Sequence, residues 1–370
     1  MRSFVITSES VTLGHPDKLC DQISDAVVDA CLAQGGRPEV VAECALATGI
    51  VFLSVRGTAE PPCDLAALAR RVIAEAGYPA EEGDGPTVML DLAPEAAAGA
   101  GQMTTAFGFA SDDTPEMLPL PLAAAHRLAR ALDAARTSGG ASWLSPDAQV
   151  QVAVRYSDRK PVDLPAIAFA AAIRDVVDPG RIETWLGREI VPDAFAGLAL
   201  VPGASTRLVC KTTATADGPQ SHSGLTGRKT AIDTYGGFAR QSAAALSGKS
   251  PARVDRTAQY AARAVAQAVV RAGLARNCEV QLCYLLGEAV PVSVEVDTFG
   301  TGRLADATIE ARLCEVFDFR AEAIAERFAL WDLPRLRAGR FYRDLACYGQ
   351  MGRMDLAAPW EAAQIATLLS

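Results

Sequence analysis

The first thirty residues hold the side chains best suited to chemistry. His15, Asp17 and Lys18 lie around Pro16, shortly after the run Ser8-Glu9-Ser10. They directly precede an apolar-periodic segment, so the sequence places them at the start of a predicted helix. A histidine, a carboxylate and an ammonium side by side can bind a polyanion and a metal ion, and such groupings are typical of active sites. The pattern therefore predicts an active site near the N-terminus.

A second cluster combines glycines with cationic residues. Glycines that alternate with Arg and Lys allow a backbone to approach phosphates closely while fixed positive charge faces them. Taken singly, each element is also compatible with a solvated loop, and Gly248-Lys249-Ser250 is not a Walker A motif because Ala243 replaces the required earlier glycine. The motifs are Gly224-Leu225-Thr226-Gly227-Arg228-Lys229, Asp233-Thr234-Tyr235-Gly236-Gly237, Ser247-Gly248-Lys249 and Val254-Asp255-Arg256.

Helices and strands that must position these groups alternate along the chain, so the predicted fold class is α+β. Apolar periodicity predicts helices near residues 19–34, 64–77, 120–137 and 256–273. β-branched runs predict strands at 40–46, 49–53, 148–154 and 278–284. The Ala- and Gly-rich segment 93–101 and the polar segment 212–223 are the candidate loops or domain boundaries. We find no repeat in the sequence.

Composition excludes several classes of protein. The chain has 370 residues, 50% of them hydrophobic and 21% charged, which is an ordinary globular balance. A net charge of −9 argues against nucleic acid as the main partner, because phosphate-tracking surfaces need clustered cations. Nine cysteines without a C-x-x-C pair indicate buried reduced thiols rather than a disulfide framework or structural zinc. No apolar run is long enough to cross a membrane, so we expect a cytoplasmic protein with no membrane partner.

Taken together, the two clusters resemble the methionine adenosyltransferase family, also called S-adenosylmethionine synthetases. The resemblance extends from Ser8 to about Trp360 and includes Asp297-Thr298-Phe299-Gly300-Thr301 and Tyr348-Gly349. It implies three similar α/β-sandwich domains about a pseudo-threefold axis, which we expect at residues 1–98, 99–213 and 214–370. It also implies that methionine sulfur attacks C5′ of ATP, displacing the triphosphate, which is then hydrolysed to diphosphate and phosphate.

The resemblance implies a role for each matching residue. His15 would contact the triphosphate near the breaking bond, and Asp17 and Asp255 would hold two Mg²⁺ ions. Glu43 occupies the position of a K⁺ ligand, although it has an equally good interpretation as a strand-edge carboxylate. The phosphates would be held by Arg228, Lys229, Lys249 and Arg253, with Glu9 beside them. The family also implies a homodimer, or a dimer of dimers, with active sites at the interface.

The family pattern changes where it binds the amino acid. Arg56, Gln102 and His222 stand at three positions where the family has carboxylates, so we expect a more positive acceptor pocket. Gln149 replaces a lysine, whereas Arg253 replaces a lysine with its charge kept. The segment that opens the family's gating loop aligns with residues 92–96, and the loop itself is shorter. Residues 242–245 replace a glycine-rich stretch. His126 is interpreted as structural.

Three hypotheses remain open at this point. The first is a methionine adenosyltransferase with a rearranged acceptor pocket. The second is a diverged enzyme of the same fold that uses another, possibly anionic, acceptor or cleaves the triphosphate without methionine, as Arg56 and Gln102 suggest. The third is a weakly active regulatory or structural subunit, motivated by Gln149 and the short loop.

Overall fold

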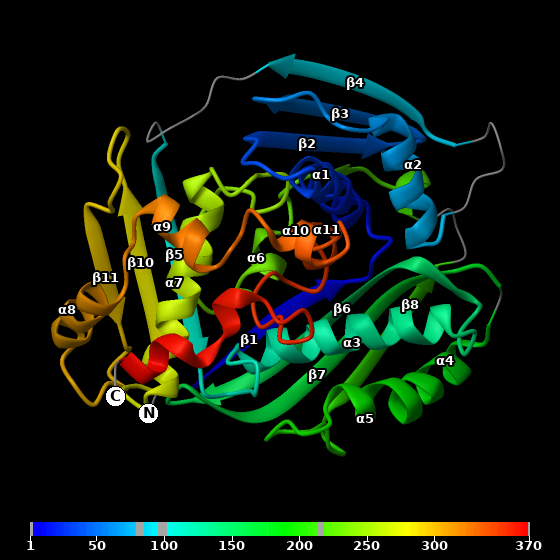
Figure 1. Cartoon of the computed structure of the whole chain (residues 1–370). Helices are drawn as coiled ribbons and strands as arrows, with labels where there is room; N and C mark the ends of the chain where they lie inside the picture. Colours follow the sequence, from blue (N-terminus) through cyan, green and yellow to red (C-terminus); the bar gives the residue numbers. More distant parts are fainter. Residues whose placement is uncertain (1–2, 79–84, 95–101, 176, 214–217, 369–370) are drawn as a thin grey trace.

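A computed structural model describes residues 3–78, 85–94, 102–175, 177–213 and 218–368. In this part of the chain, three β-sheets surround a centre occupied by helices (Figure 1). The fold class is α+β, as the sequence predicts. No helix in the described part of the chain has both the length and the apolar character needed to cross a membrane.

Sheet A has the strand order β1-β6-β7-β8. Its first three strands are antiparallel, and β8 joins β7 in parallel. Helix α3 packs on this sheet against β1 and β6, and its inward face is lined by alanine and leucine. The bounds are β1 (Ser3–Val11), β6 (Leu144–Ser157), β7 (Lys160–Ile173), β8 (Arg207–Thr213) and α3 (Leu120–Thr137).

Sheet B has the order β4-β3-β2-β9, and helix α1 lies against β2 and β9. The opposite side of α1 meets α2, α10 and α11, so the helix is buried on nearly its whole circumference. The bounds are β2 (Val40–Ala47), β3 (Ile50–Gly57), β4 (Thr87–Pro94), β9 (Gly224–Leu225), α1 (Pro16–Ala33), α2 (Leu65–Ala76), α10 (Leu333–Leu336) and α11 (Tyr342–Leu345).

Sheet C has the order β11-β10-β5 and is covered by helix α7. A side chain at Gly108 of β5 would overlap the backbone of Ala262 in α7, so glycine is what permits this close approach. The bounds are β5 (Thr104–Ser111), β10 (Asn277–Tyr284), β11 (Ser293–Asp297), α7 (Val254–Arg271), α8 (Asp306–Val316) and α9 (Ala321–Arg327).

Shorter elements complete the described chain. Near the C-terminal end, the rings of Tyr260 and Trp360 stack with their centroids 3.7 Å apart, which attaches η3 to α7. The remaining elements are α4 (Pro179–Trp185), the π-helical turn η1 (Leu186–Ile190), α5 (Val191–Ala194), α6 (Thr230–Asp233), η2 (Gly218–Gln220), η3 (Pro359–Glu361) and η4 (Ala363–Leu368).

The three units share one design, in which an 18-residue helix packs on each sheet. Each sheet nevertheless includes a strand from another third of the chain. β1 belongs to sheet A, β5 to sheet C and β9 to sheet B. The expected boundaries at 98 and 213 remain predictions, since residues 95–101 and 214–217, and with them most of the first candidate loop, lie outside the described part.

All nine cysteines are free thiols. Five are buried, as the sequence led us to expect, whereas Cys63 and Cys314 are exposed and Cys210 and Cys283 are half-buried.

Candidate active site

Helix α1 carries four buried aspartates, one on every fourth residue. This spacing places their side chains along one face of the helix. Each of the four carboxylates accepts backbone N–H groups from segments more than 200 residues further along the chain. Because a buried carboxylate is costly unless it is paired, these contacts fix the distant segments on α1. The four residues are Asp17, Asp21, Asp25 and Asp29.

Asp17 is the point where the two sequence clusters meet. Its Oδ1 accepts a hydrogen bond from the backbone N–H of Leu225 at 3.1 Å, and Nε of Arg228 lies 3.2 Å from the same oxygen. The ammonium of Lys229 lies 3.3 Å from Oδ2. That oxygen is buried and has no hydrogen-bond partner. One carboxylate therefore holds two cations in place, and its Oδ2, which is ion-paired with Lys229 but accepts no hydrogen bond, can take a further ligand.

His15 is the N-cap of α1. The backbone N–H of Asp17 donates to its Nδ1 at 3.2 Å, and Pro16 fills the first helical position, where no N–H is needed. Burial lowers the pKa of His15 to about 3, with the nearby Lys229 ammonium adding to the effect. The ring is therefore neutral, and because Nδ1 accepts, its proton resides on Nε2.

Lys18 is fully buried between two carboxylates. It donates to Asp21 at 2.8 Å and also to Asp233 on α6. Burial lowers the pKa of Lys18, but the two carboxylates outweigh burial and raise it, so the ammonium stays charged. Asp21 additionally accepts the N–H of Gly227 at 2.8 Å. This network holds the turn that carries Arg228 and Lys229.

Asp25 positions the segment Ser247-Gly248-Lys249. It accepts the N–H of Gly248 at 2.8 Å and pairs with Arg256 at 2.7 Å, with both side chains buried. Arg256 also donates to the carbonyl oxygen of Lys249 at 2.8 Å. Lys249 in turn forms a close ion pair with Asp255, whose Oδ1 is buried without a hydrogen-bond partner. A second cation and carboxylate are therefore presented together at the start of α7.

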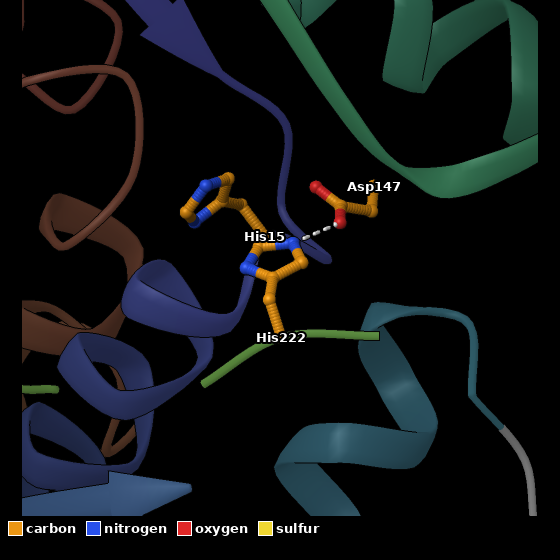
Figure 2. A group of neighbouring side chains, drawn as sticks. All are labelled: His15, Asp147 and His222. Atoms are coloured by element: carbon orange, nitrogen blue, oxygen red, sulfur yellow. Dashed lines mark hydrogen bonds and ion pairs between the residues drawn. The ribbon is translucent and has the colours of Figure 1, made fainter. Parts of the chain in front are cut away.

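His222 lies beside His15 in the structure (Figure 2). Its Nε2 is 2.8 Å from Oδ2 of Asp147, which also accepts the N–H of Gly218 at 3.2 Å. The two imidazole rings meet edge to face, with centroids 5.1 Å apart. The sequence singled out both histidines, but nothing in it indicated that Asp147, at the start of β6, would join them.

Arg56, Gln102 and His222 have separate partners in the described part of the chain. Gln102 accepts the N–H of Val254 at 2.9 Å, at the N-terminus of α7. Arg56 pairs across sheet B with Val41, which bridges to Lys249 on its other side, so Arg56 and Lys249 lie in one row across the sheet. Within the described part of the chain, no hydrogen bond or ion pair joins Arg56, Gln102 or His222 to another of the three.

The structure also places Gln149, Glu43 and Arg253, which the sequence singled out. Gln149 donates to Glu9 at 2.7 Å, so the amide that replaces a lysine is used to hold this carboxylate. Glu43 is exposed on β2, opposite Ser54. Arg253 is the N-cap residue of α7, next to Val254 and Asp255.

His126 has a structural environment. Its Nδ1 lies 2.9 Å from Oγ of Ser10, and burial lowers its pKa well below the ordinary value. The ring is thus a neutral, buried link between α3 and β1.

Comparison with known proteins covers the whole chain. Family models match residues 3–89, 97–214 and 216–362, as the N-terminal, central and C-terminal domains of S-adenosylmethionine synthetase. The S-adenosylmethionine synthase of Synechococcus elongatus is 41% identical over an alignment covering 100% of this chain and 97% of that protein. That of Prochlorococcus marinus is 43% identical and covers 98% of this chain and 94% of its own length. The chain belongs to the S-adenosylmethionine synthetase family.

Proposed function

We propose that this protein transfers the adenosyl group of ATP to the sulfur of methionine, giving S-adenosylmethionine, diphosphate and phosphate. Family membership and the names of the relatives support this first hypothesis. They do not favour another acceptor or a subunit role. The observation that carries the proposal is Asp17, which holds Arg228 and Lys229 at the N-terminus of α1 while one buried oxygen lacks a hydrogen-bond partner.

Displacement at C5′ requires stabilisation of a leaving group with about four negative charges. Arg228, Lys229 and Lys249 supply three cations, each already held by a carboxylate. Held in this way, they need little rearrangement when a triphosphate binds, and preorganised charge of this kind is the largest contribution to many enzymatic rates. Arg253, beside Asp255, adds a fourth cation to the same region in this proposal.

Two Mg²⁺ ions fit the oxygens of these same carboxylates that accept no hydrogen bond. Asp17 Oδ2 and Asp255 Oδ1 are buried oxygens without hydrogen-bond partners, and hard oxygen donors are what Mg²⁺ binds. When bound, the ions would neutralise developing charge on the triphosphate. The residues themselves orient the cations. We assign Glu43 as a K⁺ ligand on the exposed face of β2.

His15 acts in this proposal as a neutral hydrogen-bond donor. The Asp17 N–H at Nδ1 leaves the proton on Nε2, which can donate to an oxygen near the bond that breaks. A neutral donor stabilises the triphosphate oxygen as charge develops there.

A homodimer is the assembly that sheet B supports. One row across its open face consists of Leu225, Ala45, Phe52 and Met89. The three larger side chains of this row are 44–54% exposed. A second copy would cover this row, and with it Arg56, which points from the same face of β3. Arg56 would then lie near the partner's site. Equilibrium sedimentation should give twice the mass of one chain, and a monomer would contradict this arrangement.

The activity test follows products. The purified protein is incubated with ATP, Mg²⁺ and K⁺, with and without methionine, and nucleoside products are followed by mass spectrometry beside diphosphate and phosphate. We expect methionine-dependent S-adenosylmethionine in the wild type and its loss in Asp17→Asn, with Asp318→Asn as an exposed control. Consumption of ATP without that product would contradict the proposal.

A further inference from the structure

The group formed by His15, Asp147 and His222 has the composition of a transition-metal site. One ring nitrogen of each histidine and one carboxylate oxygen of Asp147 all lie within 4.8 Å of one another. Figure 2 shows the three side chains converging from the start of α1, the start of β6 and the segment before β9. Ligands drawn from three separate segments of a folded chain are held at fixed positions, as a metal site requires.

The donor set distinguishes this cluster from the oxygen sites at Asp17 and Asp255. Imidazole nitrogen is a ligand for Zn²⁺, Co²⁺, Ni²⁺ and Fe²⁺, whereas Mg²⁺ prefers oxygen. Two histidines and one carboxylate occur in catalytic metal sites, where the remaining positions are left to water or a bound oxygen ligand. The accessibility of the cluster suits this arrangement, since His222 is 41% exposed while Asp147 is mostly buried and His15 is buried.

From this geometry we infer that His15, Asp147 and His222 bind one divalent transition-metal ion of the Zn²⁺ or Co²⁺ type. The ion takes the place of the hydrogen bond between His222 and Asp147, now 2.8 Å long. The donor atoms must move closer to a common centre, because ligands about 2.0–2.1 Å from zinc lie within roughly 3.5 Å of one another.

Metal binding and nucleotide binding compete for His15. The N–H of Asp17 occupies Nδ1, so an ion bound through Nε2 requires the ring proton to move to Nδ1 and this hydrogen bond to open. The same Nε2 is the atom we assign to the triphosphate. A bound transition metal would therefore exclude the ATP contact, which makes the cluster an inhibitory site.

The experiment uses Co²⁺ and the full chain without nucleotide, so its result does not depend on the proposed activity. Metal-free protein carrying Cys63→Ser and Cys314→Ser is titrated with Co²⁺, because the exposed thiols are competing ligands. Visible absorption and calorimetry should show one ion per chain, and excess Mg²⁺ should not displace it. Asp147→Asn and His222→Asn should each weaken binding roughly tenfold or more, whereas Asp163→Asn, an exposed carboxylate elsewhere on sheet A, should not.

Two results would overturn the inference. The first is Co²⁺ binding that is equal in the parent, Asp147→Asn and His222→Asn proteins, including no binding in any of them. The second is full displacement by Mg²⁺, which would place the ion on the oxygen ligands instead. ATP added to the cobalt-loaded parent should compete with the metal, and simultaneous binding at full strength would refute the shared use of His15.

Discussion

Replacing Asp25 with asparagine removes the carboxylate that compensates a buried arginine. Arg256 is 1% exposed, and its guanidinium donates to the two oxygens of Asp25 at 2.7 and 3.2 Å. Burial lowers the pKa of Arg256, but Asp25 outweighs burial and raises the pKa, so the variant loses the carboxylate that stabilises the buried charge. Asparagine can still accept the N–H of Gly248, but it turns an amide NH₂ toward the cation.

The expected loss of stability is large. Breaking a buried ion pair by removing one partner costs about 3–5 kcal/mol. With an unfolding entropy of about 2.1 cal/mol/K per residue, a chain of 370 residues has roughly 0.8 kcal/mol/K, so Tm should fall by about 4–6 °C. Turnover should also fall, because Arg256 fixes the carbonyl of Lys249.

Thermal unfolding followed by circular dichroism measures the change. Asp318→Asn, which breaks the exposed pair with Arg320, is the matched control and should shift Tm by about 1 °C or less. The double variant Asp25→Asn/Arg256→Met should lose less stability than Asp25→Asn and Arg256→Met lose in total, since it leaves no buried charge unpaired. Melting of Asp25→Asn within 1 °C of wild type would refute the role we assign to this pair.

Three further predictions concern binding, pH and packing. Lys229→Met should weaken ATP binding about ten- to a hundredfold by calorimetry, because a charge-assisted contact is lost, whereas the exposed Lys160→Met should not. Burial raises the pKa of Asp113 to about 6, above its unfolded value of about 3.9, so its contribution to stability is present below pH 4 and is lost as pH rises through 6. The stability of wild type relative to Asp113→Asn, from urea unfolding, should therefore fall between pH 4 and pH 7, and a constant difference would contradict this pKa. Gly248→Ala should destabilise the protein by more than Gly35→Ala, because both residues have positive φ but only a Cβ at Gly248 would overlap the oxygen of Ala42; equal losses would be the contrary result.

Long helices were predictable from local pattern, and the reason is visible at α1 and α3. The predicted range 120–137 matches α3, where leucine and alanine recur at helical spacing. At α1 the helix begins at Pro16 instead of residue 19, because His15 caps it and proline is accommodated at its first position. Proline was therefore part of the helix and not its boundary.

Several strands were not predictable, and β7 shows why. It contains Pro161 and Pro165, which argue against a central strand. Its Ala-rich second half is apolar throughout and does not alternate between apolar and polar residues. β7 lies inside sheet A, yet its pairing with β8 begins only at Ala166, after both prolines. The partners of β1, β5 and β9 depend on contacts between distant parts of the chain, which no local pattern encodes.

In the candidate site, residue types identified the chemistry but not the scaffold. The sequence brought Asp17, Arg228 and Lys229 into one hypothesis, and the structure places them in contact. It gave no role to Asp21, Asp25 and Asp29. Their spacing of four residues on a helix whose other residues are mostly apolar was the available signal, because a buried row of carboxylates must find donors elsewhere in the chain. The position of Asp147 beside His222 had no local signal.

The central claim is that the bond between C5′ and its oxygen breaks, so that the whole triphosphate leaves. ATP labelled with ¹⁸O at the 5′ oxygen tests it directly in a reaction with methionine and Mg²⁺. We predict that the label appears entirely in diphosphate and phosphate and is absent from the adenosyl product. Label retained in the nucleoside product would show cleavage between phosphorus and oxygen, and would contradict the adenosyl transfer proposed for this protein.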